Sequence, residues 1–245
     1  MSDLSKKEVR APDSFRALLM KVFKSLLGNK AANLVVLGVF IVGGVAYSAY
    51  NHYKQSQEEK AQAELFEVEQ LLKKDQPDAN PEAVPEPLKA EQIPDEAISM
   101  LDSVTQKYSG TNASSLAALR ASELLEIKGD LQRAGQFAKS GVENSRSELI
   151  KGLARLRFAT LQINQSKYSE ATAEIQKVLD NDSLKSLHAE AQLRLAVSYE
   201  LQSDLEKARE LYSKIVASNG ADPVGRTAKR YLHSLGKDAQ IKAKE

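Results

Sequence analysis

Between Lys30 and Lys54 the chain carries no formally charged residue, and most side chains in the stretch are apolar. A helix needs roughly 20 such residues, at ~1.5 Å of rise each, to cross a hydrocarbon layer about 30 Å thick. The stretch predicts one transmembrane helix over residues 31–53. A cleaved signal peptide has an apolar core of about 7–15 residues near the N-terminus. The later start and greater length here favour a retained anchor, and the absence of charge disfavours a buried helix of a soluble protein.

The charge on either side of this segment predicts its orientation. Residues 1–53 carry seven basic and three acidic side chains, a net +4, and residues 54–245 carry −3 because the total is +1. Since basic residues are retained on the cytoplasmic side, we expect a cytoplasmic N-terminus and a translocated C-terminal part. Tyr47, Tyr50 and Tyr53 would then lie at the far interface, with their rings in lipid and their hydroxyls in water.

The arm before the anchor, residues 1–30, has its own pattern. Apolar residues recur at i, i+3 and i+4 between Phe15 and Leu26, with Arg16, Lys21 and Lys24 on or beside the opposite face. This pattern is typical of a basic amphipathic helix that lies on an anionic leaflet. A helix that simply continues into the anchor fits equally well.

Composition excludes several classes of function. The chain has no cysteine, which rules out disulfides, cysteine metal sites and thiol nucleophiles. The translocated part is close to neutral, so it lacks the basic surface that nucleic-acid binding requires. Alanine, leucine, glutamate, lysine and glutamine dominate, a mixture that favours helices. We therefore expect an all-α protein.

The residues that could carry chemistry are scattered. The three histidines, His52, His188 and His233, show no metal-ligand spacing, and no nucleophile, zinc-binding or phosphate-binding motif occurs. We expect no catalytic residue, no metal and no cofactor. A small-molecule substrate is not expected either, and no separate domain remains for an active site.

Two different segments follow the anchor. Residues 54–75 predict a membrane-proximal helix, in which Ala61, Leu65, Val68 and Leu72 form an apolar stripe. Residues 76–94 contain five of the chain's seven prolines and several acidic residues. Because proline lacks the amide donor and restricts the residue before it, we expect an exposed, semi-extended insertion there.

Beyond Pro94 the sequence repeats with a period of 37 residues. The clearest column is alanine at 97, 134, 171 and 208 (134 − 97 = 171 − 134 = 208 − 171 = 37). Other columns hold leucine at 119, 156 and 193, and a small residue at Ser122, Ala159 and Ala196. Each unit predicts a helix, a short polar turn at 128–130, 165–167 or 202–204, and a second helix. Such hairpins bury their apolar sides by stacking into a solenoid.

The repeat resembles the tetratricopeptide repeat, in which a small residue of the first helix precedes the alanine of the second by twelve positions. Ser122, Ala159 and Ala196 precede Ala134, Ala171 and Ala208 by that distance. The resemblance covers residues 95–235, and the last part of this range, 223–235, predicts a capping helix. Residues 236–245 predict a polar tail. The period exceeds the common 34, so we expect longer turns between repeats. Residues 54–75 would supply the first helix of a leading unit.

One column places arginines at 120, 157 and 194, where a stacked array would align them along one surface. Three guanidinium groups could hold carboxylates of an extended partner segment. Alternatively, each arginine pairs with a glutamate of its own repeat, for which Glu123 and Glu190 are close enough. The family's use of the inner face of the first helix implies further partner-binding positions, namely Glu123, Thr160, Val197 and Ile163, with Glu126 and Glu200 beside them. In the anchor, Gly44 and Ser48 form a pair of small residues that favours helix packing.

The complete layout resembles the bacterial ancillary SecYEG translocon subunit family. That resemblance implies a non-enzymatic, single-pass inner-membrane protein with a periplasmic repeat domain. The implied partners are translocon subunits, periplasmic chaperones or emerging chains, together with the lipid bilayer. A membrane-anchored scaffold for another envelope complex, in cell-wall synthesis or outer-membrane assembly, is the alternative.

Overall fold

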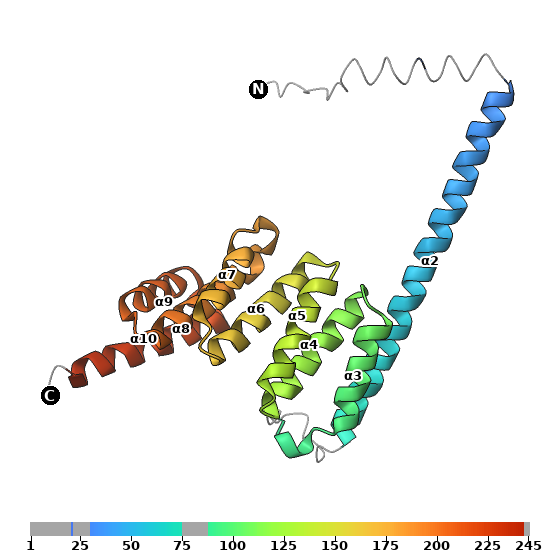
Figure 1. The fold of residues 1–245 in the computed structure, drawn as a ribbon. Coiled ribbons are helices and arrows are strands. Elements are labelled where there is room, and N and C mark those ends of the chain that lie inside the picture. Colours follow the sequence, from blue (N-terminus) through green and yellow to red (C-terminus); the bar gives the residue numbers. More distant parts are fainter. Residues whose placement is uncertain (1–20, 22–29, 75–87, 243–245) are drawn as a thin grey trace. The chain divides into compact units, whose positions relative to one another are not determined.

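The computed structural model describes residue 21, residues 30–74 and residues 88–242. The basic arm and most of the proline-rich insertion therefore lie outside the described residues. The chain divides into two compact units, Met1–Gln55 and Ser56–Glu245. In the described residues every regular element is helical (Figure 1). The expected all-α fold class is confirmed.

Helix α2 runs from Lys30 to Lys74 without a break at the predicted boundary between anchor and membrane-proximal helix. Its segment Val35–Lys73 contains a window that is long and apolar enough to cross a membrane, and none of that window is buried. A membrane span and a signal sequence both fit this description. Between Val35 and Val45 most large apolar side chains are exposed, as Phe40 illustrates at 74%.

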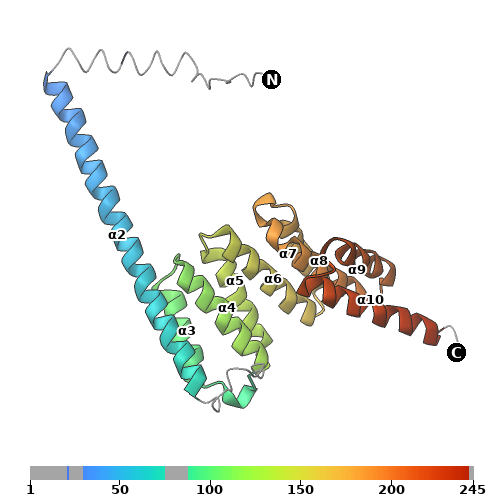
Figure 2. The same ribbon diagram turned by 180° about the vertical axis from the view of Figure 1, so that it is seen from behind.

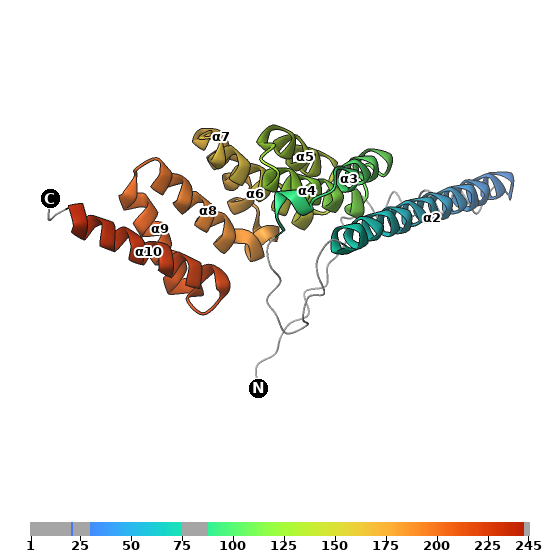
Figure 3. The same cartoon turned by 90° about the horizontal axis from the view of Figure 1, so that it is seen from below.

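The second unit is a row of helices joined by short turns (Figures 1 and 2). Each helix from α3 to α10 packs against the next, and α4, α6, α8 and α10 also contact one another in succession. The helices are α3 (Asp95–Lys107), α4 (Asn112–Ile127), α5 (Leu131–Asn144), α6 (Glu148–Asn164), α7 (Tyr168–Leu179), α8 (His188–Leu201), α9 (Leu205–Asn219) and α10 (Pro223–Lys242). The hairpins α4–α5, α6–α7 and α8–α9 are the predicted repeats (Figure 3).

The turns inside the hairpins occupy residues 128–130, 165–167 and 202–204, as predicted. Their middle residues stand 37 apart and all have positive φ: Gly129 at 82°, Ser166 at 59° and Ser203 at 63°. A left-handed residue just past a helix end lets the chain reverse direction. The same backbone turn is therefore built with glycine once and with serine twice.

The turns between hairpins are longer at only one place in the described repeats. Helices α5 and α6 are joined by residues 145–147, whereas α7 and α8 are separated by eight residues that include a short 3-10 helix, η2 (Asp182–Leu187). The expectation of longer turns is wrong for α5–α6. There the additional length of the repeat lies in α6, which has 17 residues.

The alanine column lies in the core, since Ala97, Ala134, Ala171 and Ala208 are all 0% exposed. The small residues twelve positions earlier, Ser122, Ala159 and Ala196, are also 0% exposed. Small side chains at both positions allow the paired helices to approach closely. The physical reason for the repeat's spacing is thus visible in the packing.

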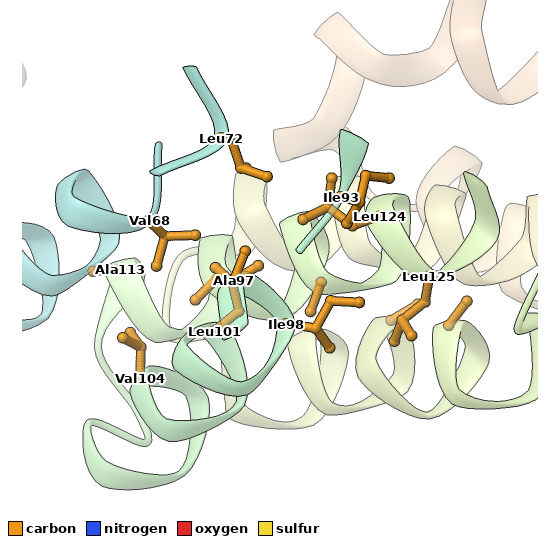
Figure 4. Packing of buried hydrophobic residues seen from close by; sticks show 14 of the residues in the cluster. Val68, Leu72, Ile93, Ala97, Ile98, Leu101, Val104, Ala113, Leu124 and Leu125 are labelled. Carbon is orange, nitrogen blue, oxygen red and sulfur yellow. The ribbon is translucent and has the colours of Figure 1, made fainter. Parts of the chain in front are cut away.

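The buried residues form three clusters along the row. The first joins the C-terminal part of α2 to α3, α4 and α5, with Val68 and Leu72 beside Leu101 and Leu124 (Figure 4). The second lies between α6, α7 and α8, and the third between α8, α9 and α10. The residues after Lys54 thus pack as the first helix of the leading hairpin, against α3.

Two sequence expectations need correction. The described end of the proline-rich insertion is not exposed throughout, because Ile93 is only 2% exposed and belongs to the first cluster, where it follows the 3-10 turn η1 (Ala90–Gln92). The predicted polar tail is helical as far as Lys242, so the capping helix does not end at Leu235. Polar composition hid this continuation, because a helix is recognised in a sequence by its apolar periodicity, which fades after Leu235.

Candidate partner-binding groove

An open groove of ≈ 430 Å³ lies on the face formed by α2, α4 and α6 in the second unit. Its apolar residues are Leu65, Leu116 and Leu119, and its charged residues are Glu69, Arg120, Glu123 and Arg157. Three of the predicted partner-binding residues, Arg120, Glu123 and Arg157, therefore line one concavity. We call it the inner groove.

Arg120 is held from two sides. Its Nε and Nη2 donate to the two carboxylate oxygens of Glu69 at 2.9 and 3.2 Å, and its Nη1 donates to Glu123 at 2.7 Å. Burial acts to lower the pKa of Arg120, but the Glu123 hydrogen bond and the Glu69 charge outweigh it and raise the pKa above its ordinary value. The two-oxygen contact fixes the guanidinium plane. It also joins α2 to α4.

Arg157 reaches back to the preceding repeat. Its Nε donates to the hydroxyl of Ser122 at 3.1 Å and its Nη2 to the carbonyl of Ser122 at 2.9 Å. Its Nη1 lies 2.6 Å from Oε2 of Glu126, while Oε1 of the same carboxylate accepts from the Asn164 side chain at 2.7 Å. Ser122 is fully buried. These contacts therefore connect Arg157, on the inner face, to the interior between α4 and α6.

Arg194 repeats the arrangement one hairpin further on. Its Nε donates to the hydroxyl of Thr160 at 2.9 Å, and its Nη1 pairs with Glu190. Burial, with a smaller contribution from the charge of Arg157, lowers the pKa of Arg194 to about 10. The side chain remains protonated at neutral pH because that pKa is well above 7.

The arginine column therefore links consecutive first helices. Pairing within one repeat is confirmed for Arg120 with Glu123 and for Arg194 with Glu190, but Arg157 takes its glutamate from the preceding repeat. The contacts between repeats follow from stacking, because each arginine also reaches the preceding first helix, at Glu69, Ser122 or Thr160. The arginines order the face that a partner would contact.

The other predicted positions lie in different environments. Thr160 is half-buried and bridges α6 to Arg194, while Val197 is half-buried against the third cluster. Ile163 is 5% exposed and belongs to the second core cluster, so its expected place on an open surface is corrected. The physical reason is that it lies near the C-terminal end of α6, where the hairpin closes over the core that holds Ala171. Gly44 and Ser48 lie on an exposed part of α2.

Sequence reasoning missed the apolar part of the inner face. Leu116 and Leu153 are 42% and 39% exposed, and they stand 37 residues apart (153 − 116). Each lies four positions before an arginine of the column and so shares its helix face. The sequence does contain a signal for them, because leucine recurs at 116 and 153, one repeat period apart. This column is separate from the columns that the sequence assigns to the core.

The described residues contain no cluster of three or more His, Cys, Asp or Glu side chains suited to a metal. The two carboxylates of the inner groove, Glu69 and Glu123, both pair with Arg120. The groove can therefore present apolar surface flanked by fixed charges, which suits recognition of a polypeptide segment.

Comparisons with known proteins agree with the repeat architecture. The family model described as the tetratricopeptide repeat-like domain matches residues 27–237. Two crystal structures from Podosopora anserina, both described as kinesin light chain nearly identical TPR-like repeats, are similar in fold. One of them, a variant with a single substitution, has 12% identity and a TM-score of 0.53, and the other has 13% and 0.52; each comparison covers 76% of this chain and 90% of the other. A search of curated proteins gave no significant match.

Proposed function

This chain belongs to the tetratricopeptide repeat-like domain family, and on that premise we propose that it is a membrane-anchored scaffold whose inner groove holds a segment of a partner protein. Tetratricopeptide-like folds typically serve protein–protein interaction without catalysis. The observation that carries the proposal is the inner groove, in which Leu65, Leu116 and Leu119 lie beside fixed charges. Exposed apolar side chains set among ordered polar groups are a common composition of partner-binding surfaces.

The exposed leucines are the principal contacts in this proposal. Arg120 and Arg157 already donate from each of their guanidinium nitrogens to protein oxygens, so a partner carboxylate would have to share them. Burial of Leu116 and Leu153, by contrast, needs no contact to be broken. Removing apolar area from water is favourable by about 25 cal/mol per Å².

The proposed location is the bacterial inner membrane, with the N-terminus in the cytoplasm and the repeats in the periplasm. The support is the charge difference across the anchor, +4 over residues 1–53 against −3 over residues 54–245. The family model begins at residue 27 and so spans the apolar segment together with the repeats. An anchor that belongs to the same family unit as the repeats supports retention over cleavage.

The more specific form of the proposal is an ancillary role at the Sec translocon. The anchor would contact the channel, with Gly44 and Ser48 as packing positions, and the inner groove would hold a periplasmic chaperone or an emerging chain. The layout of arm, anchor and repeats supports this form. The alternative is the same scaffold serving another envelope complex, in cell-wall synthesis or outer-membrane assembly.

Site-specific photo-crosslinking in native membranes tests the proposal. A crosslinking residue replaces Leu116 in the inner groove, and in a second variant it replaces Val42 in the anchor. We expect a partner adduct from position 116 and translocon adducts from position 42. A crosslinker at Lys214, which is exposed on α9, is the control and should give neither.

Substitution variants separate the groove from the anchor. With the crosslinker at position 116, Leu119→Asp in the groove and Leu153→Asp on the same face should remove the groove adduct, while Leu201→Asp, at a leucine that is 54% exposed near the end of α8, should not. Equal adducts in all three variants would contradict the groove proposal. Groove adducts without translocon adducts from position 42 would favour the alternative complex.

A further inference from the structure

A second concavity lies on another part of the repeat domain, between α5, α6 and the turn that precedes α7. It has a volume of ≈ 580 Å³ and an apolar floor that includes Leu131, Phe158 and Leu161. Its rim includes Lys139 and Lys167, and its lining residues contain no aspartate or glutamate. We call it the α5–α6 groove.

Three residues of this groove depart from what local structure favours. The first is Lys167, the N-cap of α7, which makes no side-chain hydrogen bond to the helix. The equivalent N-cap residues, Asp130 and Asp204, accept from the backbone N–H groups of Arg133 and Lys207. Helix α7 thus lacks a cap that is typically worth about 1 kcal/mol. In its place it presents a cation at the end of the groove.

The second is Gly135, in the interior of α5. A Cβ added at Gly135 would meet nothing within 4 Å, so no neighbouring helix requires glycine there. Glycine in a helix interior is less favourable than alanine by about 1 kcal/mol. Gly135 is one of the residues that line the groove, so the groove stays open because this position has no side chain.

The third is Gln162, which is 9% exposed and also lines the groove. Its side-chain oxygen is buried and accepts no hydrogen bond from any residue that the structure describes. An unsatisfied buried acceptor typically costs about 1–3 kcal/mol. Because this oxygen is buried, a backbone N–H of a bound peptide would reach it only once the Gln162 amide rotates toward the groove.

The repeats provide an internal comparison. The groove positions 131, 132, 135, 136 and 139 correspond to 205, 206, 209, 210 and 213 on α9, which line a concavity of their own. There Glu206 and Glu210 stand where α5 has Gln132 and Gln136. The amides and cations of the α5–α6 groove are therefore a property of this groove and not of the repeat. The missing cap, the helix-interior glycine and the unsatisfied amide oxygen all occur in one groove. Such a concentration of locally unfavourable residues is typical of functional sites.

We propose that the α5–α6 groove binds an extended acidic peptide segment of a partner protein, with one apolar side chain on the floor and a carboxylate toward each lysine. Lys167 lies at the Leu131 end, where Gln165 donates to the Leu131 carbonyl at 3.3 Å. Lys139 lies eight residues further along α5, a rise of about 12 Å. Alternate residues of an extended peptide share one face at about 3.3 Å per residue, so acidic, apolar and acidic residues at positions one, three and five span about 13 Å.

The electrostatics predict weak, salt-sensitive binding. Lys139 lies 3.6 Å from Glu143 on its own helix, and Lys167 donates to Gln165 at 2.8 Å. Both lysines are exposed, so a peptide carboxylate competes with these contacts and with water. The apolar floor then supplies the contacts that a non-specific charge attraction lacks.

The test is fluorescence anisotropy with the full chain in mild detergent and a fluorescein-labelled peptide, Glu-Ser-Leu-Ser-Glu, at low salt. We expect binding that weakens at least fivefold in Lys167→Asp and in Lys139→Gln, and at least tenfold in Gly135→Leu, which fills the groove. Lys214→Glu, on an exposed face of α9, should leave affinity unchanged. The peptide Gln-Ser-Leu-Ser-Gln should bind at least fivefold more weakly.

The design separates binding from folding, because Lys167→Asp restores a cap and Gly135→Leu improves helix propensity. Both variants should resist denaturant at least as well as the wild type while they bind the peptide less. Absence of wild-type binding, or equal affinity across the variants, would overturn the proposal. So would self-association that the peptide displaces and Glu206→Lys abolishes, since the occupant would then be a second copy.

Discussion

The carboxylate of Glu58 on α2 accepts the backbone N–H of Ala113 at 2.9 Å, in the first turn of α4. The second oxygen of Glu58 accepts the N–H of Asn112 at 2.8 Å. The first N–H groups of a helix have no partner within the helix, and a negative charge is favourable at that end. Since the side chain of the N-cap residue Thr111 satisfies only the N–H of Ser114, Glu58 completes the cap from a different helix. The leading hairpin is thereby joined to the first repeat.

Replacing Glu58 with alanine should lower the free energy of unfolding by about 0.5–2 kcal/mol, the usual range for a lost cap. Glu58→Gln keeps one acceptor oxygen and should lose less. Chemical denaturation followed by circular dichroism measures both. Glu67→Ala, at an exposed position on the same helix, is the matched control, and an equal loss there would contradict the capping role.

The left-handed turn residues predict opposite effects of glycine and alanine. A left-handed conformation costs a residue with a Cβ roughly 1–2 kcal/mol. Ser166→Gly and Ser203→Gly should therefore stabilise the domain, by less than that amount because glycine also loses more backbone entropy. Gly129→Ala should destabilise it by about 1 kcal/mol, through backbone strain alone, since a Cβ at Gly129 meets nothing within 4 Å.

Denaturation midpoints of the three variants test this prediction. Ser169→Gly, on the first turn of α7, is the control and should not stabilise, because glycine lowers helix propensity there. A loss of stability in both Ser166→Gly and Ser203→Gly would contradict the argument.

The helical hairpins were predictable because their signals are local and repeated. The alanine column, the small residues twelve positions earlier and the polar turns each recur at 37 residues, so one correct unit predicts the next. The end of α10 was not predictable in this way. Polar residues from 236 onward read as a tail, but nothing in them prevents the helix from continuing to Lys242.

The groove residues were only partly predictable, because their environment depends on the neighbouring repeat. The arginine column was visible in the sequence, but the contact of Arg157 with Ser122 joins residues 35 apart through stacking. The unsatisfied oxygen of Gln162 is a property of packing and leaves no sequence signal at all. Ile163 is an error in the other direction. The resemblance to the repeat family implies a surface position for it, but the side chain is buried.

Glu64 predicts an acid-dependent loss of stability. Hydrogen bonds from Lys107 at 2.6 Å and from the hydroxyl of Tyr108 at 2.7 Å hold the pKa of Glu64 below its ordinary 4.5. A carboxyl with a lowered folded-state pKa stabilises the fold at pH values above 4.5, and that contribution disappears as the pH falls below it. The pair is partly exposed, so the contribution is below about 1 kcal/mol.

The free energies of unfolding of the wild type and Glu64→Gln, measured at pH 7 and pH 3, check this prediction. The wild type should be the more stable at pH 7, and the difference should shrink at pH 3. Glu67→Gln should show no such change. A difference that stays constant with pH would mean that Glu64 acts through packing rather than through its charge.

Tyr212 predicts the opposite behaviour at high pH. Its side chain is fully buried, its ring stacks on Tyr231 of α10 at 5.5 Å between centroids, and its hydroxyl donates to Glu200 at 2.7 Å. Burial first, and then the hydrogen bond to the Glu200 carboxylate, raise the pKa of Tyr212 well above its ordinary 10.0. A raised folded-state pKa contributes stability that is present below pH 10 and is lost as the pH rises beyond it.

Tyr212→Phe keeps the ring stack but removes the hydroxyl. At neutral pH it should lower the free energy of unfolding by about 1.5–3 kcal/mol, the usual range for a hydrogen bond to a charged group. Above pH 10 the wild type should lose stability faster than Tyr212→Phe, because only its unfolded state can ionise residue 212. Tyr231→Phe, at a ring that is 40% exposed, is the control for the stack. In an ultraviolet titration the folded wild type should show one tyrosine that ionises later than the exposed ones, and that late step should be missing in Tyr212→Phe. If the late step persists in the variant, the late-ionising tyrosine is not Tyr212, which would contradict the buried hydrogen bond that joins α9 to Glu200 of α8.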